Sequence, residues 1–274
     1  MKIRKSIQLA FLALALMTGG ASSYAQLHAL TQGTQVTAPA KTGASEKLPS
    51  AKEVRDRFVK ELGGKEAIQK HESYTLTGRL EVPAAGVSGD ITAYAMRPDR
   101  QFARITIPGY GEITSGYDGA VAWRMDPSTG PMVLTGRMLE QALREADMDS
   151  QLKPESEFAS VEVVEKTTFE GQDAYKLKYV TKTGETFFEY YSVASGLQIG
   201  GEYDAETPMG VMKVVTTMKE YKEFEGMRMP THVEATQGPM KQIVKVGSVS
   251  TSKVDPAVFA LPPQIKALVE KPKN

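Results

Sequence analysis

The chain has 274 residues, of which 41% are hydrophobic, and this is enough for one domain with a substantial core. It contains no cysteine, which excludes disulfides, thiolate chemistry and a lipid-modified cysteine. Its formal net charge is zero, and the mature chain expected below is slightly acidic, which argues against nucleic acid or an anionic membrane surface as the main partner.

The first 25 residues have the pattern of a secretory signal peptide. Three basic residues in the first five positions precede an apolar run at residues 7–17, and small residues lead to a cleavage site after Ala25. A membrane anchor is the alternative, but the run is shorter than the roughly 20 residues that a spanning helix needs. Cleavage leaves 30 Lys and Arg against 33 Asp and Glu, a net charge of −3. We therefore expect an exported, periplasmic protein.

Residues 26–49 are rich in Gln, Thr, Ala, Gly, Ser and Pro and are predicted to be a disordered linker. A single domain is predicted over residues 50–263, followed by a tail at 264–274. The domain opens with Ser50 and Glu53 at the spacing of a capping box. The apolar face of the helix that follows ends at Gly63 and Gly64 and consists of Val54, Phe58, Val59 and Leu62.

The next part of the chain alternates apolar and polar residues, as half-buried strands do. Strands are predicted at residues 74–82 and 87–97, and three more at 101–108, 112–117 and 120–126. Asp118-Gly119 between the last two is a strong hairpin signal. A second helix is predicted at residues 135–148, with one apolar side and one charged side that meets water.

The second half again has strands separated by short turns that contain glycine. They are predicted at residues 160–169, 174–181, 185–193, 197–203, 211–221, 228–236 and 242–250. About a dozen such strands predict one large antiparallel meander, in a mainly β fold of the α+β class. A sheet this wide curls towards a half-barrel, and two helices cannot fill its mouth. The pattern therefore predicts an apolar cavity under a helical cover.

Alternation on the strands predicts one inner surface, although it cannot separate a filled interior from an open one. The residues expected to line the ligand cavity are Leu76, Leu80, Ile105, Ile107, Trp123, Leu177, Tyr179, Ile199, Met212 and Met218, with Tyr175, Leu197 and Val214 on the same surface.

Methionines gather in the last strands, at positions 209, 212, 218, 227, 229 and 240. Their flexible thioethers suit a surface that accepts ligands of varied shape, and ordinary core packing is the alternative. A copper site is a third interpretation, but the methionines are scattered over both strand faces.

No catalytic motif is present: the chain lacks HExxH, GxSxG and a P-loop. His232 and Glu234 share one strand face and form a metal site only if His71 and Glu72 join them; solvated surface histidines are the alternative. The carboxylates of the strands look like polar faces rather than an acid–base pair. We therefore predict no enzyme activity and no cofactor.

One stretch carries a family resemblance. Arg97-Pro98, Phe102 and Arg104, Asp118-Gly119, Trp123 and Asp126-Pro127 form a spaced pattern that resembles the LolA-like superfamily of periplasmic lipoprotein carriers. The resemblance implies a curved antiparallel sheet with a lid of helices that binds lipids or the acyl chains of lipoproteins. It also implies that Arg97 lies at the cavity and helps to hold the lid. The long linker and the helix at 135–148 depart from the carriers.

The sequence thus predicts a periplasmic binding or carrier protein for a hydrophobic ligand, with lipid or lipoprotein acyl chains held in an apolar cavity. The alternative is an envelope sensor or interaction domain that binds an inner- or outer-membrane protein.

Overall fold

The computed structural model describes residues 47–207 and 210–270. The predicted signal peptide, nearly all of the predicted linker and Met209 lie outside these residues. In the described part of the chain, thirteen strands form one antiparallel sheet, which is strongly curved and does not close. The predicted mainly β half-barrel is confirmed.

The first six strands are β1 (Ser73–Val82), β2 (Val87–Met96), β3 (Arg100–Ile107), β4 (Gly111–Tyr117), β5 (Ala122–Asp126) and β6 (Gly130–Val133). The remaining seven are β7 (Ser160–Phe169), β8 (Gln172–Val180), β9 (Thr186–Ser192), β10 (Gln198–Thr207), β11 (Gly210–Phe224), β12 (Met227–Gln237) and β13 (Met240–Ser250). The helices are α1 (Ala51–Glu61), α2 (Gly64–Lys70), α3 (Gly136–Ala146) and α4 (Pro263–Val269).

The strand order differs from a single meander. It runs from β6 back to β1, then from β13 back to β7, so that the first and last strands pair at the middle of the sheet. Leu80 of β1 lies opposite Val244 of β13 in this register. The two edges, β6 and β7, are therefore consecutive in the chain, and α3 with short 3-10 helices connects them across the concave side. Local turns cannot encode a pairing between strands about 170 residues apart. Such a pairing forms only when the two halves of the sheet come together around a common core.

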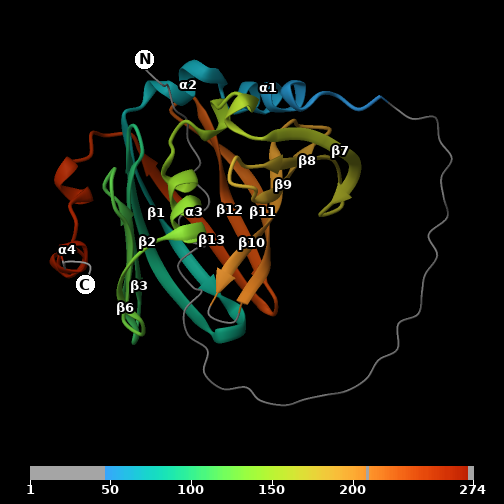
Figure 1. Cartoon of the computed structure of the whole chain (residues 1–274). Helices are drawn as coiled ribbons and strands as arrows, with labels where there is room; N and C mark the ends of the chain where they lie inside the picture. Colours follow the sequence, from blue (N-terminus) through green and yellow to red (C-terminus); the bar gives the residue numbers. More distant parts are fainter. Residues whose placement is uncertain (1–46, 208–209, 271–274) are drawn as a thin grey trace, which may run out of the picture.

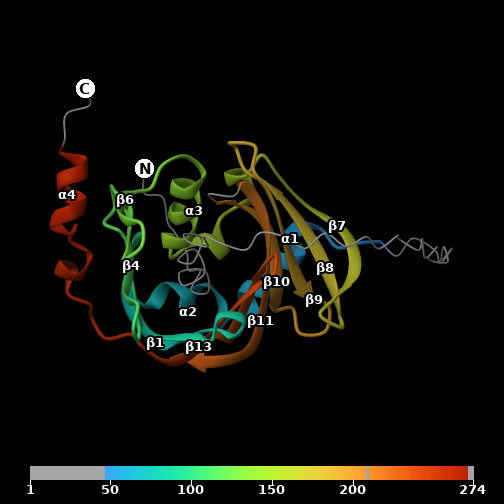
Figure 2. The same ribbon diagram turned by 90° about the horizontal axis from the view of Figure 1, so that it is seen from below.

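Figure 2 shows the sheet bent around α2 and α3, with α4 outside it beside β6. The capping box of α1 is confirmed: the Ser50 hydroxyl oxygen accepts a hydrogen bond from the Glu53 amide, and the Glu53 carboxylate accepts one from the Ser50 amide. The Asp118 hairpin is also confirmed, and its carboxylate accepts bonds from the amides of Ala120 and Val121.

Two local predictions are wrong. Residues 130–133 form the short edge strand β6, where no strand was predicted, since four residues that include Pro131 have no readable alternation. The predicted tail begins with α4, whose Ile265 is fully buried. The number of helices is accordingly larger than the two predicted.

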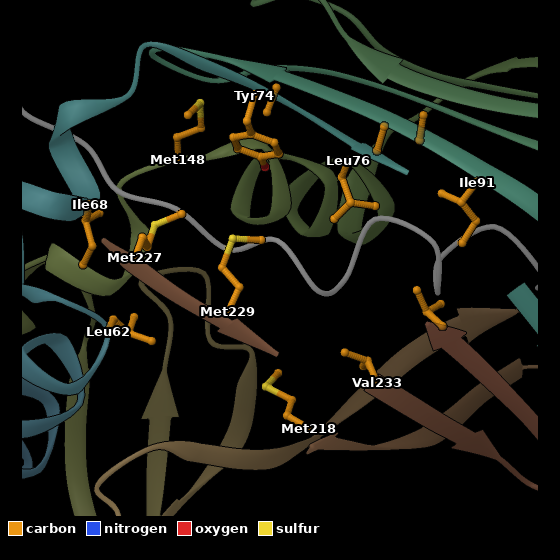
Figure 3. Close-up of a cluster of buried hydrophobic side chains, with 14 of the residues drawn as sticks. Leu62, Ile68, Tyr74, Leu76, Ile91, Met148, Met218, Met227, Met229 and Val233 are labelled. Carbon is orange, nitrogen blue, oxygen red and sulfur yellow. The ribbon is translucent and has the colours of Figure 1, made fainter. Parts of the chain in front are cut away.

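The main core lies where β1–β3 and β12–β13 meet α1 and α2. Figure 3 shows Met218, Met227 and Met229 in the same buried cluster as Leu62 and Ile68. All three methionines are buried, at 3–6% exposure. Among the described residues, no helix has both the length and the apolar character that crossing a bilayer requires.

Candidate functional site

A cavity of about 290 Å³ lies between the inner wall of β8–β9, helices α1 and α3, and the segment between α3 and β7. A smaller hollow of about 80 Å³ lies between α3 and β9–β10. The two share part of their walls. The shared residues are Arg144, Phe187, Glu189 and Gln198.

Aromatic rings form the apolar wall of the larger cavity. Tyr179 and Phe187 stack with their ring centroids 4.7 Å apart, and Phe158 meets Tyr179 edge to face at 5.1 Å. From α1, Phe58 packs edge to face against Tyr191 at 5.2 Å. Because these rings have few rotatable bonds and hold each other, they keep the wall in shape without filling the space beside it.

Buried polar groups interrupt this wall. Glu189 accepts a hydrogen bond from the Tyr191 hydroxyl, and the Tyr179 hydroxyl lies 3.2 Å from that of Tyr191. Burial raises the pKa of Glu189, and hydrogen bonds from the tyrosines offset this only in part. Burial also keeps the pKa of both tyrosines well above the ordinary value. The cavity thus offers an apolar surface with a small hydrogen-bonding group at its base, the usual composition of a ligand pocket.

Arg55 of α1 adds a positive charge. Its guanidinium donates to the Lys153 carbonyl oxygen at 2.7 Å and lies 5.9 Å and 5.8 Å from the ring centres of Phe158 and Tyr179. Lys153 itself forms an ion pair with Asp147. The segment after α3 is thereby attached to α1 over the cavity.

Helix α3 covers the cavity and contacts both sides of the half-barrel. Its Ala142 and Ala146 pack against Tyr117 and Ala122 of β4–β5. On the opposite side, Arg137 and Arg144 donate to Glu185 at the start of β9, at 3.0 Å and 2.6 Å. The prediction that the charged side of this helix meets water is therefore wrong, because that side faces the β9–β10 wall.

Two carboxyl groups at this joint have perturbed pKa values. Burial acts to raise the pKa of Glu185, but the two arginines outweigh it and hold the pKa below the ordinary value. Burial raises the pKa of Glu145 to about 7, and a hydrogen bond from Gln141 and the charge of Arg144 oppose this only weakly. We therefore expect the joint between α3 and β9 to respond to pH and to salt.

Arg97, the residue expected at the lid, connects two covering segments. It donates to the carbonyl oxygens of Ile68 and His71 at the end of α2, at 2.9 Å and 3.0 Å. It also forms a buried ion pair with Asp149, just after α3, at 2.7 Å. This geometry joins α2 to the segment that follows α3.

The structure distributes the predicted cavity residues over several regions. Tyr179 lines the larger cavity. Six others belong to the main core cluster: Leu76, Leu80, Ile105, Ile107, Leu177 and Met218. Met212 is half-buried near the β10–β11 end of the sheet, where its methyl group approaches Gly238.

Ile199 and Trp123 lie on the convex face instead. A register shift between Gln198 and Gly200 turns Ile199 towards Tyr190, away from the cavity that Gln198 lines. Trp123 packs against Phe102, whose neighbour Ala103 belongs to the main core, so alternation places both rings on the outer side. A bulge and the choice of face are not readable from periodicity alone.

Sequence reasoning missed Arg55, Phe158, Phe187 and Glu189. Alternation at Phe187, Glu189 and Tyr191 on one predicted strand was a signal that could have found the wall. A charged residue on the apolar face of α1, beside Val54 and Phe58, was the signal for Arg55.

His232 pairs with Glu234 and Glu220 on β11–β12, and Glu234 also accepts bonds from Lys219 and Lys241. No group of three or more histidine, aspartate and glutamate side chains in residues 47–207 and 210–270 is placed to hold a metal ion. His71 is buried at the end of α2 and does not join this group.

No protein-family model matches the chain, and no curated protein matches it either. Solved structures are similar in fold. A LolA superfamily protein from Nitrosomonas europaea is 12% identical with a TM-score of 0.52, over 78% of this chain and 99% of that one. A DUF1329 family protein from Desulfovibrio piger is 11% identical with a TM-score of 0.53, over 76% and 96%. The chain has a LolA-like fold.

Proposed function

We propose that this LolA-like half-barrel is a periplasmic protein that binds and carries a hydrophobic ligand, a lipid or the acyl chains of a lipoprotein, in the cavity beneath α1 and α3. The observation that carries the proposal is the cavity of about 290 Å³, whose wall is built from Phe58, Phe158, Tyr179 and Phe187. Its volume is close to the lower end of the range for small-ligand sites, about 300–1,000 Å³. Non-covalent burial supplies the affinity, at about 25 cal/mol for each Å² of apolar surface removed from water.

The attachment of α3 supports release as well as binding. Towards β4–β5 the helix is held by buried alanine contacts, whereas towards β9 it is held by ion pairs of half-exposed arginines. Such ion pairs contribute only about 0–1 kcal/mol each, because water and salt screen them. The same side also carries the hydrogen bond from Thr183 to Glu140, so the contacts of α3 with this wall are largely polar, and we expect the helix to separate here rather than from β4–β5 when the cavity opens.

Mass spectrometry of organic extracts tests the proposal directly. The purified protein is expected to carry a lipid in stoichiometric amount; no lipid in any preparation contradicts the proposal. A stable membrane-protein partner without lipid, recovered from envelope extracts, favours an interaction domain instead. Cell fractionation tests the periplasmic location.

A matched pair of variants links binding to this cavity. Leu143 lines it and Leu268 lies on α4, and both are 38% exposed helical leucines. Leu143→Asp is expected to weaken binding of an uncharged fluorescent apolar probe about tenfold, because it places a charge at the cavity wall. Leu268→Asp is expected to leave binding unchanged. Equal affinity of both variants places the ligand elsewhere.

A further inference from the structure

Arg55 has an unusual environment for an arginine. Its side chain extends from α1 into the wall of the cavity, and the residue is only 9% exposed. A guanidinium has five N–H donors. Among the described residues, only the Lys153 carbonyl oxygen accepts a hydrogen bond from that of Arg55. No described carboxylate forms an ion pair with it. Burial of a charge without a charged partner is costly, so proteins normally pair it.

The rings beside Arg55 hold it in position. Phe158 and Tyr179 lie within 6 Å of the guanidinium, where cation–π attraction partly replaces the lost hydration. Ring contacts of this kind supply no acceptor oxygen to the N–H groups of the guanidinium. A planar guanidinium with free N–H groups at an apolar cavity matches the geometry of a carboxylate or a phosphate.

Glu189 is the competing partner, since it also lines the cavity. Its carboxylate accepts a hydrogen bond from Tyr191, and the Arg55 charge attracts it although the two side chains form no ion pair. Burial favours its uncharged form and raises its pKa, which leaves the charge of Arg55 less compensated. The other charged residues of the lining are Arg144, Lys153 and Lys182, against Glu140 and Glu157. The two paired cations among them have carboxylate partners outside this list, Glu185 and Asp147.

We infer that the ligand is an anionic single-chain amphiphile, whose carboxylate or phosphate head binds the Arg55 guanidinium while its acyl chain lies along Phe158, Tyr179 and Phe187. This inference rests on the proposed function and specifies the ligand of the same cavity. The small volume favours one chain over several. Arg55 takes the role of the positively charged anchor.

The full chain, stripped of lipid, is titrated by calorimetry with three probes that share one acyl chain. One ends in a carboxylate, one in a phosphate monoester and one in an uncharged alcohol. We expect one or both anionic probes to bind at least about tenfold more tightly than the alcohol, since a charge-assisted hydrogen bond is worth about that factor. The two anionic arms identify which head the site takes.

Arg55→Met keeps the length and apolar contacts of the side chain and removes its charge. It is expected to weaken binding of the anionic probes about tenfold or more and to leave the alcohol within about twofold. Arg57→Met is the matched control, because Arg57 lies on the same helix and bonds the carbonyl oxygens of Val193 and Ala194 outside the cavity. It is expected to leave all three affinities unchanged. Arg55→Lys keeps the positive charge but loses the planar, forked arrangement of N–H donors. Its affinity for the anionic probes is expected to lie between those of the wild type and Arg55→Met.

Equal wild-type affinity for the anionic and uncharged probes overturns the anchor while the proposed function stands. Equal weakening of all three probes by Arg55→Met has the same meaning, because it indicates a structural role. Failure of the wild type to bind any probe overturns the proposed function and the anchor together. If Arg55→Met does not fold, the difference in wild-type affinity between the anionic probes and the alcohol still tests the anchor.

Discussion

Two regions of one sheet have different interiors. Where β1–β3 meet β12–β13, aliphatic residues such as Leu80, Ile105 and Val233 belong to a buried cluster on the concave side together with residues of α1 and α2. Where β8–β10 form the wall, the inward residues include Tyr179 and Phe187, and a cavity remains beside them. We call these the filled region and the hollow region. Both have the same alternation of inward and outward residues, so alternation does not determine whether an interior is packed.

Side-chain chemistry explains the difference. Aliphatic and methionine side chains adopt rotamers that fill irregular gaps. Rings held by mutual stacking cannot adjust in this way. Buried polar groups such as Glu189 and Arg55 also need partners, which keeps apolar atoms from closing over them. The hollow region is thus distinguished by stacked aromatic rings combined with buried polar groups.

The largest expected effect is at the joint between α2 and the segment after α3. Arg97→Met leaves Asp149 buried without its partner and frees two carbonyl oxygens of α2. We expect a loss of about 3–5 kcal/mol in the free energy of unfolding, measured by urea denaturation. The control Arg79→Met removes an exposed pair with Asp90 and should cost less than about 1 kcal/mol. Similar costs for both variants exclude a joining role for Arg97.

A pair of truncations tests the two regions against each other. Leu80→Ala in the filled region should cost about 2–5 kcal/mol of stability and leave the affinity for the apolar probe within about twofold, because Leu80 is fully buried away from the cavity. Phe187→Leu in the hollow region should cost less than about 1.5 kcal/mol of stability but lower the affinity for the probe several-fold. The reverse pattern, with Leu80→Ala weakening the probe more, would show that the ligand lies in the filled region.

Glu145 makes the hollow region sensitive to pH. Its folded pKa of about 7 is above its unfolded value, so ionisation destabilises the folded protein fully above pH 7 and not at all below about pH 4.5. Glu145→Gln should therefore raise stability by about 1–3 kcal/mol at pH 8, with the gain vanishing towards pH 4.5. Thermal unfolding of both proteins at several pH values measures this, and a gain independent of pH contradicts it.

The smallest effect concerns Trp123, the only tryptophan of the chain. It is buried on the convex face against Phe102, across the sheet from the cavity. We expect its fluorescence maximum to stay unchanged when a non-absorbing lipid saturates the protein. A clear shift in the maximum on binding would place the ligand near Trp123 or reveal a rearrangement of the whole sheet.

The sequence by itself determined most of the elements and the class of the fold, but not the short edge strand β6 or helix α4. The capping box at Ser50, the Asp118 turn and the period of two along the strands act over a few residues, so they can be read without knowledge of the rest. The resemblance around Arg97 correctly indicated the half-barrel, whereas a role of Arg97 in holding a lid stays a prediction.

Only the tertiary structure decided how these elements are arranged in space. The pairing of β1 with β13 places both sheet edges in the middle of the chain, and α3 crosses between them with its charged side inward. The bulge at Gln198 turned Ile199 outward, and the packing of Phe158 against Tyr179 left space beside Arg55. Each of these features depends on contacts between residues far apart in the sequence. Together they determine where the interior is packed and where a cavity remains.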